Sequence, residues 1–274
     1  MKQIVSIILT GCLLMMSSCN PEVEIPAYIY VEQTDFIAED LNQQGTSSSK
    51  IANIWVTVDG TDIGTYTLPA LVPVIASGNT DIKIAAGIKL NGLSVQRPIY
   101  PLYTLYQQTS FLRKGMIDTI FPVFHYQSDV KIPLKEDFES AGLNFYSIEG
   151  SAALEKTQDP ALLFHYPNEN NNFSGIIQLP FADSVYYFEI KTIDRALPFN
   201  ANSVTDCFVE MNYCFSENVE IGIYVHSSTS ITRQYSICNI VGTPNLEWGK
   251  IYVNLTDIIS DATANMSMTH FDIY

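Results

Sequence analysis

Two short runs of alternating apolar and polar residues, joined by an Asp-Gly dipeptide, constrain the fold of this chain most strongly. The first run covers Ile54–Val58, the dipeptide is Asp59-Gly60, and the second run covers Ile63–Leu68. Asp-Gly between alternating runs is among the strongest short signals for a β-hairpin, because the tight turn requires positive φ. No sustained helical periodicity interrupts this part of the chain up to about residue 127. These patterns predict an all-β fold.

The composition of the chain supports this prediction and excludes several classes of protein. Tyr (16 residues) and Phe (14 residues) accompany many Ile, Val and Thr, the residue types enriched in strands. Apolar residues make up 47% of the 274 residues and charged residues only 16%, which argues against intrinsic disorder. The net charge is −15 without a basic cluster. This charge argues against a nucleic-acid partner and against docking on an anionic membrane through charge.

The first 18 residues have the features of a secretion signal. Lys2 precedes an apolar run over Ile4–Met16, which is shorter than the roughly twenty residues of a membrane span. Ser17 and Ser18 then precede Cys19, and this pattern resembles the lipobox of bacterial lipoproteins. The resemblance implies cleavage before Cys19 and acylation of its thiol and its new amino group, with palmitate among the acyl chains. The alternative is an ordinary signal peptide that happens to be cleaved beside a cysteine.

Residues 19–24 are expected to form the lipidated cysteine and a tether to the folded body. Asp directly after the lipidated cysteine often retains Gram-negative lipoproteins in the inner membrane, and this chain has Asn20 there. The resemblance therefore implies the outer membrane. Glu22 and Glu24 weakly resemble the acidic export signal of surface lipoproteins, or they belong to a plain solvated linker. The face of the membrane stays open.

We expect a first β-domain over residues 25–128, followed by a linker over 129–135. Several segments of this domain resemble PEGA-type and carboxypeptidase-regulatory-like modules, namely Val56–Gly60, Gly64, Leu68-Pro69, Gly78 and Ile82–Ile84 with Gly87. The resemblance implies a small Ig-like β-sandwich without catalysis. Two further segments, Ile25–Val31 and Gly87–Gly92, resemble a set of uncharacterised Gram-negative outer-membrane lipoproteins.

A second β-domain is expected over residues 136–274. Its acidic start at Glu136–Glu139 and its stretch Trp248–Thr256 are similar to jelly-roll domains of the carbohydrate-binding-module type, which implies a jelly-roll β-sandwich. Strands are predicted at Ala161–Tyr166, Gly175–Leu179, Val185–Ile193, Asp206–Phe215, Glu220–His226, Tyr235–Ile240, Lys250–Leu255 and Thr269–Tyr274. The strand-like Phe271–Tyr274 either closes the fold or precedes a missing final strand, and we favour truncation.

Three cysteines remain after Cys12 leaves with the signal and Cys19 is lipidated. Cys207 and Cys214 lie in one predicted strand, so a disulfide between them would break that strand. Cys238 could reach one of them across neighbouring strands. We favour three free, buried thiols, and no CxxC spacing suggests zinc.

Candidate glycan-binding residues lie in an Asn-rich loop and at one tryptophan. Glycan recognition needs exposed aromatic faces together with amide and carboxylate groups. The loop offers Tyr166, Asn170, Asn172 and Phe173, and Trp248 could stack on a sugar ring. The alternative is a solvated turn whose aromatic residues pack inward, with Trp248 at the core or its rim.

The jelly-roll resemblance also implies a structural Ca²⁺ ion near the first and last strands. Glu136, Asp137, Glu139 and Asp272 could supply the oxygen ligands that calcium prefers. We expect no other cofactor.

Three tyrosines at a spacing of three, Tyr100, Tyr103 and Tyr106, lie in a Pro-flanked stretch. They could form a strip that binds a partner, or they could cover the end of the first domain. We favour the cover.

No catalytic motif is present: the sequence lacks G-x-S-x-G, a P-loop and a metal-binding histidine pair. We therefore expect a non-catalytic envelope lipoprotein that binds glycan through its C-terminal jelly roll. The alternative is an accessory or scaffold protein of an outer-membrane complex without a small ligand, and an enzyme is the third possibility.

Overall fold

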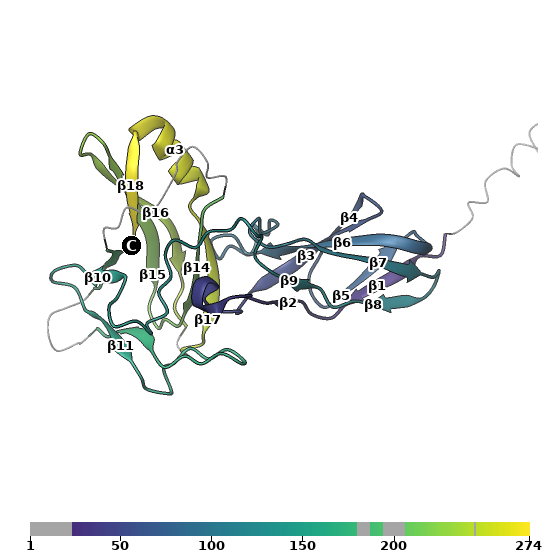
Figure 1. Ribbon diagram of the computed structural model, residues 1–274, viewed down its shortest axis with the longest axis horizontal. Coiled ribbons are helices and arrows are strands. Elements are labelled where there is room, and N and C mark those ends of the chain that lie inside the picture. Colours follow the sequence, from purple (N-terminus) through teal and green to yellow (C-terminus); the bar gives the residue numbers. More distant parts are fainter. Residues whose placement is uncertain (1–23, 180–186, 194–205, 244) are drawn as a thin grey trace, which may run out of the picture.

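The computed structural model describes residues 24–179, 187–193, 206–243 and 245–274. The signal peptide, Cys19 and most of the predicted tether lie outside these residues. The described chain consists mainly of strands arranged in several sheets, which confirms the all-β prediction. Figure 1 shows an elongated first half, residues 24–128, and a second half that begins near residue 136.

The first half contains two larger sheets and one short strand pair. One sheet has the order β5-β1-β8, in which β1 runs antiparallel to β5 and parallel to β8. The second sheet has the order β4-β3-β6-β7 and is antiparallel throughout, and β2 pairs with β9 in parallel. The strands are β1 (Ala27–Val31), β2 (Asp35–Phe36), β3 (Ile51–Val58), β4 (Thr61–Tyr66), β5 (Ala70–Val74), β6 (Gly78–Ile88), β7 (Tyr106–Leu112), β8 (Ile117–Thr119) and β9 (Val123–Phe124).

Alternation along these strands builds one core between the two sheets. Ala27, Ile29 and Val31 of β1 are buried, whereas Tyr28 and Tyr30 point to the other face and are half-buried. The same period of two is typical of a strand with one buried face. The predicted hairpin is confirmed, since β3 and β4 are joined by Asp59 (φ 48°) and Gly60 (φ 78°).

The second half contains four further groups of strands and one longer helix. β14 (Phe208–Tyr213) pairs with β17 (Gly249–Asn254), and a three-stranded sheet has the order β16-β15-β18. The strands of that sheet are β15 (Val219–Ser227), β16 (Thr232–Ile240) and β18 (Met268–Ile273). Two short pairs complete the described strands, β10 (Phe145–Ser147) with β13 (Ile190–Thr192) and β11 (Leu154–Thr157) with β12 (Ser174–Ile177).

A second core lies between β14–β17 and the sheet of β15, β16 and β18. Ile223, Val225, Val253 and Phe271 are among its buried residues. Every residue of β14 is only half-buried, although β14 occupies a central place between the two halves. This incomplete burial reflects a cavity beside β14, described below.

Several local predictions for the second half are wrong. Ala161–Tyr166 is a turn and loop rather than a strand, since Pro160 and Pro167 bound it and disfavour a ladder. The helix α3 (Thr256–Met266) was not predicted, although Ile259 and Ala262 face the core at helical spacing. β10 and β11 were missed as well, and so was the short helix α2 (Leu41–Gln44) of the first half, which Asp40 caps. Part of the predicted strand Val185–Ile193 lies outside the described residues.

Gly222 on β15 has no room for a side chain, so Gly222→Ala is expected to destabilise the second half. A Cβ atom there would collide with the backbone carbonyl of Tyr235 and would lie 2.6 Å from the ring of Tyr274. Overpacking of this kind costs about 1–3 kcal/mol of the free energy of unfolding. Chemical denaturation measures this loss. The matched control is Gly142→Ala, where nothing lies within 4 Å, and an equal loss in both variants would contradict the steric argument.

Candidate functional site

A cluster of tyrosines around one ion pair joins the two halves. Glu210 of β14 accepts hydrogen bonds from the hydroxyls of Tyr100 (2.8 Å) and Tyr126 (2.9 Å). Lys250 of β17 places its Nζ 2.7 Å from the other carboxylate oxygen of Glu210, and the side chains of Lys250 and Glu210 are only 6% and 16% exposed. The carboxylate thus has a donor from each half of the protein, so it connects them.

Tyr252 of β17 extends this cluster into the core of the first half. Its hydroxyl accepts a hydrogen bond from the backbone N–H of Lys50 (3.0 Å) and lies 3.2 Å from the hydroxyl of Tyr103. Its backbone C=O accepts a hydrogen bond from the N–H of Asn91 (2.9 Å). Tyr100 and Tyr103 are almost fully buried here, which confirms that they cover the end of the first half.

Tyr106 does not belong to this junction, because it lies on β7 and donates to Gln108. Burial, and then the nearby Glu210 carboxylate, raise the pKa of Tyr100, Tyr103 and Tyr126 well above the usual value of a tyrosine. The phenols therefore stay protonated and donate hydrogen bonds at any ordinary pH. Because these hydroxyls already have partners, the cluster serves to hold the halves together rather than to bind a ligand.

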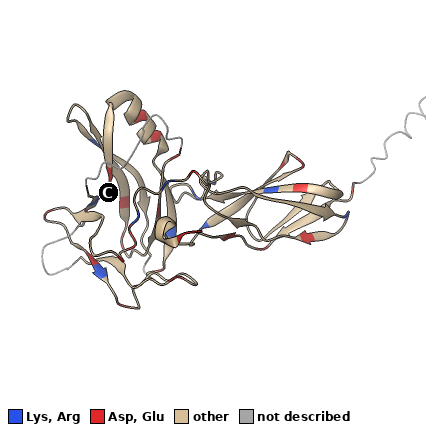
Figure 2. Ribbon diagram, viewed as in Figure 1, with Lys and Arg blue, Asp and Glu red and all other residues tan. Residues whose placement is uncertain are grey.

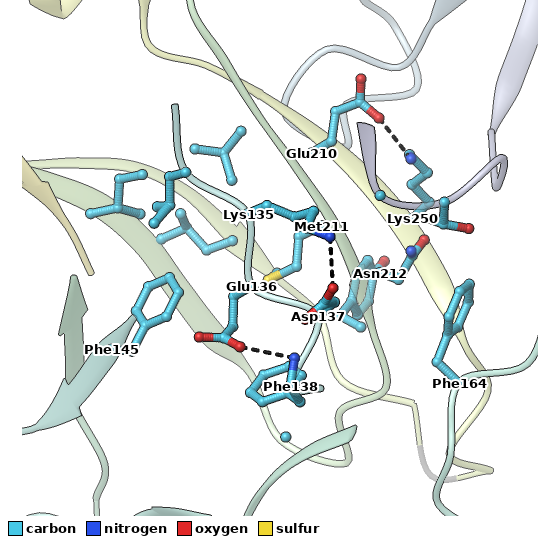
Figure 3. A pocket seen from close by; sticks show the side chains of 18 of the residues that line it. Lys135, Glu136, Asp137, Phe138, Phe145, Phe164, Glu210, Met211, Asn212 and Lys250 are labelled. Carbon is cyan, nitrogen blue, oxygen red and sulfur yellow. Dashed lines mark hydrogen bonds and ion pairs between the residues drawn. The ribbon is translucent and has the colours of Figure 1, made fainter. Parts of the chain in front are cut away.

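A cavity of about 2720 Å³ lies beside this junction and extends into the second half. Its wall combines aromatic side chains with polar groups. Figure 3 shows Phe145 and Phe164 on opposite sides of the view, with the segment that carries Phe138 between them. Asn212 and the Glu210–Lys250 ion pair line the same space. Pockets for small ligands usually measure roughly 300–1,000 Å³, so this space could hold an extended ligand.

The structure brings three of the five predicted glycan-binding residues to this cavity. Asn170, Phe173 and Trp248 line it. Trp248 is 38% exposed, and its ring packs edge-on against Phe164 at 5.2 Å between centroids. The Asn-rich loop and Trp248 are thus neighbours, although about 80 residues separate them in the sequence.

Tyr166 and Asn172 do not line the cavity. The amide of Asn172 donates to Glu139 (3.1 Å), and the backbone N–H groups of Asn172 and Phe173 donate to the same carboxylate (2.7 and 3.1 Å). Tyr166 is half-buried, and burial followed by the charges of Asp35 and Glu169 raises its pKa. For these two residues, the packing alternative describes the structure better than ligand binding does.

The four predicted calcium ligands do not form a cluster. Glu136 accepts hydrogen bonds from the backbone N–H groups of Phe138 (2.8 Å) and Asn144 (2.6 Å), and Glu139 is held by the Asn172 loop. Asp272 pairs with His226 on the neighbouring strand, at 2.9 Å. In the described part of the chain, no group of three or more acidic, His or Cys side chains could hold a metal ion. The calcium prediction therefore fails, because the carboxylates are used within the protein.

The ion pair of Lys135 with Asp137, at 2.7 Å, has the same internal role. Burial alone would raise the pKa of Asp137, but the hydrogen bonds from Lys135 and from the backbone of Glu139 outweigh it and lower this pKa. Asp137 is thus an ionised carboxylate that orders the start of the second half.

A polar and aromatic cluster around Tyr224 of β15, which borders the same cavity through Glu189 and Tyr274, was not predicted. Tyr224 donates to Glu189 (2.9 Å), Lys191 lies 3.6 Å from the centroid of its ring, and the ring of Tyr274 lies 4.9 Å away. Burial and the Glu189 carboxylate raise the pKa of Tyr224 to about 12. The alternation of polar and aromatic residues at Glu220, Tyr224 and His226 could have indicated this face. Because the groups of this cluster bind one another, the part of the cavity wall that holds Trp248 and Phe173 is the stronger candidate for a ligand.

The three cysteines of the second half are free thiols, as expected, although they are not fully buried. Cys207, Cys214 and Cys238 are each half-buried. Burial raises the pKa of Cys207 to about 11, and burial together with Glu220 raises that of Cys238 to about 11. Such thiols stay protonated near neutral pH and are poor nucleophiles.

Comparison with known protein families found no matching family, and comparison with curated proteins found no match. Neither helix in the described residues has the length and apolar character needed to cross a membrane.

Proposed function

We propose that this protein is a non-catalytic lipoprotein of the outer membrane whose second half binds an extended glycan in the cavity beside β14. The proposed anchor is an acylated Cys19. The proposed architecture is an Ig-like β-sandwich over residues 25–128 and a jelly-roll β-sandwich over residues 136–274. Two sheets that share one core in the first half, and two facing groups of strands in the second, support this architecture.

The observation that carries the proposal is the meeting of Trp248, Phe173 and Asn170 at one large cavity. Aromatic rings offer apolar faces to the C–H surface of a sugar, and amides offer both a donor and an acceptor to its hydroxyl groups. Lys250 and Glu210 add charged groups at the inner wall, but each is already paired with the other. An uncharged or weakly charged oligosaccharide therefore fits this wall better than a strongly charged one.

The proposal is tested with the chain from Asn20 onward, without the lipidated cysteine, on a broad panel of glycans. We expect micromolar-to-millimolar binding, weakened about tenfold by Trp248→Ala because the stacking face is lost. The matched control is Trp55→Ala, since Trp55 is 39% exposed but lies on β3 of the first half.

If binding survives Trp248→Ala, the ligand is still a glycan, but its site does not include Trp248. An equal loss in both variants would contradict a site at this cavity. No binding to any glycan would make an accessory or scaffold protein of an outer-membrane complex the leading function, and cross-linking in the intact envelope would then seek its partner.

A further inference from the structure

Three segments meet at the end of the first half where β1 begins (Figure 1). They are the start of the described chain, the turn between β5 and β6, and the turn between β7 and β8. The backbone N–H of Gly115 donates to the C=O of Pro26 (2.8 Å), and the N–H of Tyr28 donates to the C=O of Met116 (2.9 Å). Val74 stands opposite Ala27, which brings the β5–β6 turn to the same place. We call this end the tip.

The tip exposes five large apolar side chains, each between 58% and 62% accessible: Ile25, Ile75, Phe111, Met116 and Ile117. They come from all three segments and surround the tip, with Phe111 on the outer face of one sheet and Ile117 on the outer face of the other. Ile25 approaches the β7–β8 turn closely, with its Cγ2 3.7 Å from the position of a Cβ atom on Gly115. Several large apolar side chains exposed at one end of a domain indicate a surface that contacts a protein or a membrane.

Two cations accompany these side chains. Arg113 and Lys114 lie in the β7–β8 turn and are exposed, and the guanidinium of Arg113 lies 5.4 Å from the centroid of the Phe111 ring. Among the described residues, no carboxylate lies within ion-pair distance of either cation. Figure 2 shows this basic position at the tip of a chain that is acidic as a whole. Apolar side chains flanked by unpaired cations suit the boundary between lipid headgroups and acyl chains.

The sequence places the proposed anchor at the same end. Cys19 precedes Glu24, the first described residue, by five positions. Five extended residues span at most about 17 Å, so an acylated Cys19 holds the tip within that distance of the bilayer surface. The net charge of the whole chain opposes an anionic surface, so the apolar side chains of the tip supply most of the contact and its two local cations add to it.

We propose that the tip docks on the lipid bilayer, with Ile25, Ile75, Phe111, Met116 and Ile117 in the interfacial layer and Arg113 and Lys114 on the lipid phosphates. This docking would fix the direction in which the elongated first half carries the second half away from the membrane. The inference rests on the proposed acylation of Cys19.

The test uses the acylated full mature chain in vesicles of phosphatidylethanolamine and phosphatidylglycerol with brominated acyl chains. With Trp55 and Trp248 replaced by Phe, so that the added indole is the only one, emission of the Phe111→Trp variant is expected to shift to the blue and to fall about twofold, since bromine quenches an indole that enters the outer 5–10 Å of the acyl region. The matched control is Leu93→Trp, because Leu93 is exposed but lies in the loop near Tyr252, at the other end of the first half.

Equal quenching of both variants, or none of either, would overturn the docking of the tip. A blue shift of the Phe111→Trp variant in native outer membranes but not in vesicles would also overturn it, since a protein would then cover the tip. The mass of the purified chain separates the two proposals. An acylated chain without quenching refutes only the docking, whereas a chain without acyl mass refutes the anchor and the docking with it.

Discussion

Replacing Lys250 by Met is expected to lower the free energy of unfolding by about 3–5 kcal/mol, because it leaves the Glu210 carboxylate buried without its cation. Lys250 is 6% exposed and lies 2.7 Å from Glu210, so water cannot replace the lost ammonium group easily. Lys250 also donates to the backbone C=O of Ser48 (2.7 Å), which would lose this donor. Denaturation in guanidinium chloride measures the loss.

The two tryptophans allow each half to be followed separately. Trp55 lies in the first half and Trp248 in the second, and the chain has no other tryptophan. If the junction couples the halves, both emissions change in one transition for the unmodified chain and separate in Lys250→Met.

A surface ion pair provides the matched control for Lys250→Met. Lys83 and Asp81 lie 3.6 Å apart, with about a third of each side chain exposed, so Lys83→Met is expected to cost less than about 1 kcal/mol. In the double variant Glu210→Gln with Lys250→Met, part of the loss should return, because no unpaired charge stays buried. Equal small losses for Lys250→Met and Lys83→Met would show that Glu210 is solvated and that the junction is loose.

The features that sequence reasoning predicted depend on contacts between near neighbours in the chain. The hairpin at Asp59-Gly60 is specified by two residues and by the alternation on either side of them. The residue patterns of β15, β17 and β18 likewise predicted the ends of these strands to within one residue. The loop over residues 161–166 has apolar residues typical of a strand, but the two prolines at its borders cannot donate to a strand ladder.

The junction between the halves could not be predicted, since its partners are distant in the sequence. Glu210 meets Tyr100 and Tyr126 across 110 and 84 residues, and Tyr252 meets Tyr103 across 149. A signal does exist: Glu210 lies in a mainly apolar strand, and a buried carboxylate requires partners. The sequence does not say which residues these partners are. The same limit explains why the calcium prediction fails, because the sequence does not show that backbone N–H groups and His226 already bind these carboxylates.

Raising the pH above about 10 is expected to unfold the protein steeply, because four buried tyrosines resist ionisation in the folded state. Burial, followed by the charge of Glu210, raises the pKa of Tyr100, Tyr103, Tyr126 and Tyr252. Below the usual tyrosine pKa of about 10, these phenols are protonated in both the folded and the unfolded chain, so the full stability is present. Above it, only the unfolded chain releases the protons, and each tyrosine lowers the free energy of unfolding by about 1.4 kcal/mol per pH unit.

Four such tyrosines together give a slope of about 5.5 kcal/mol per pH unit. Absorbance at 295 nm should therefore show most of the 16 tyrosines ionising gradually, and the remainder only together with unfolding. Tyr103→Phe removes one of the four phenols, so the slope of the free energy of unfolding against pH is expected to fall by about 1.4 kcal/mol per pH unit. Tyr146→Phe is the control, since Tyr146 is 45% exposed on β10, and it should leave the slope unchanged. Smooth ionisation of all tyrosines before unfolding would show that the junction admits water, and that Glu210 and Lys250 do not form the closed pair on which the coupling of the two halves depends.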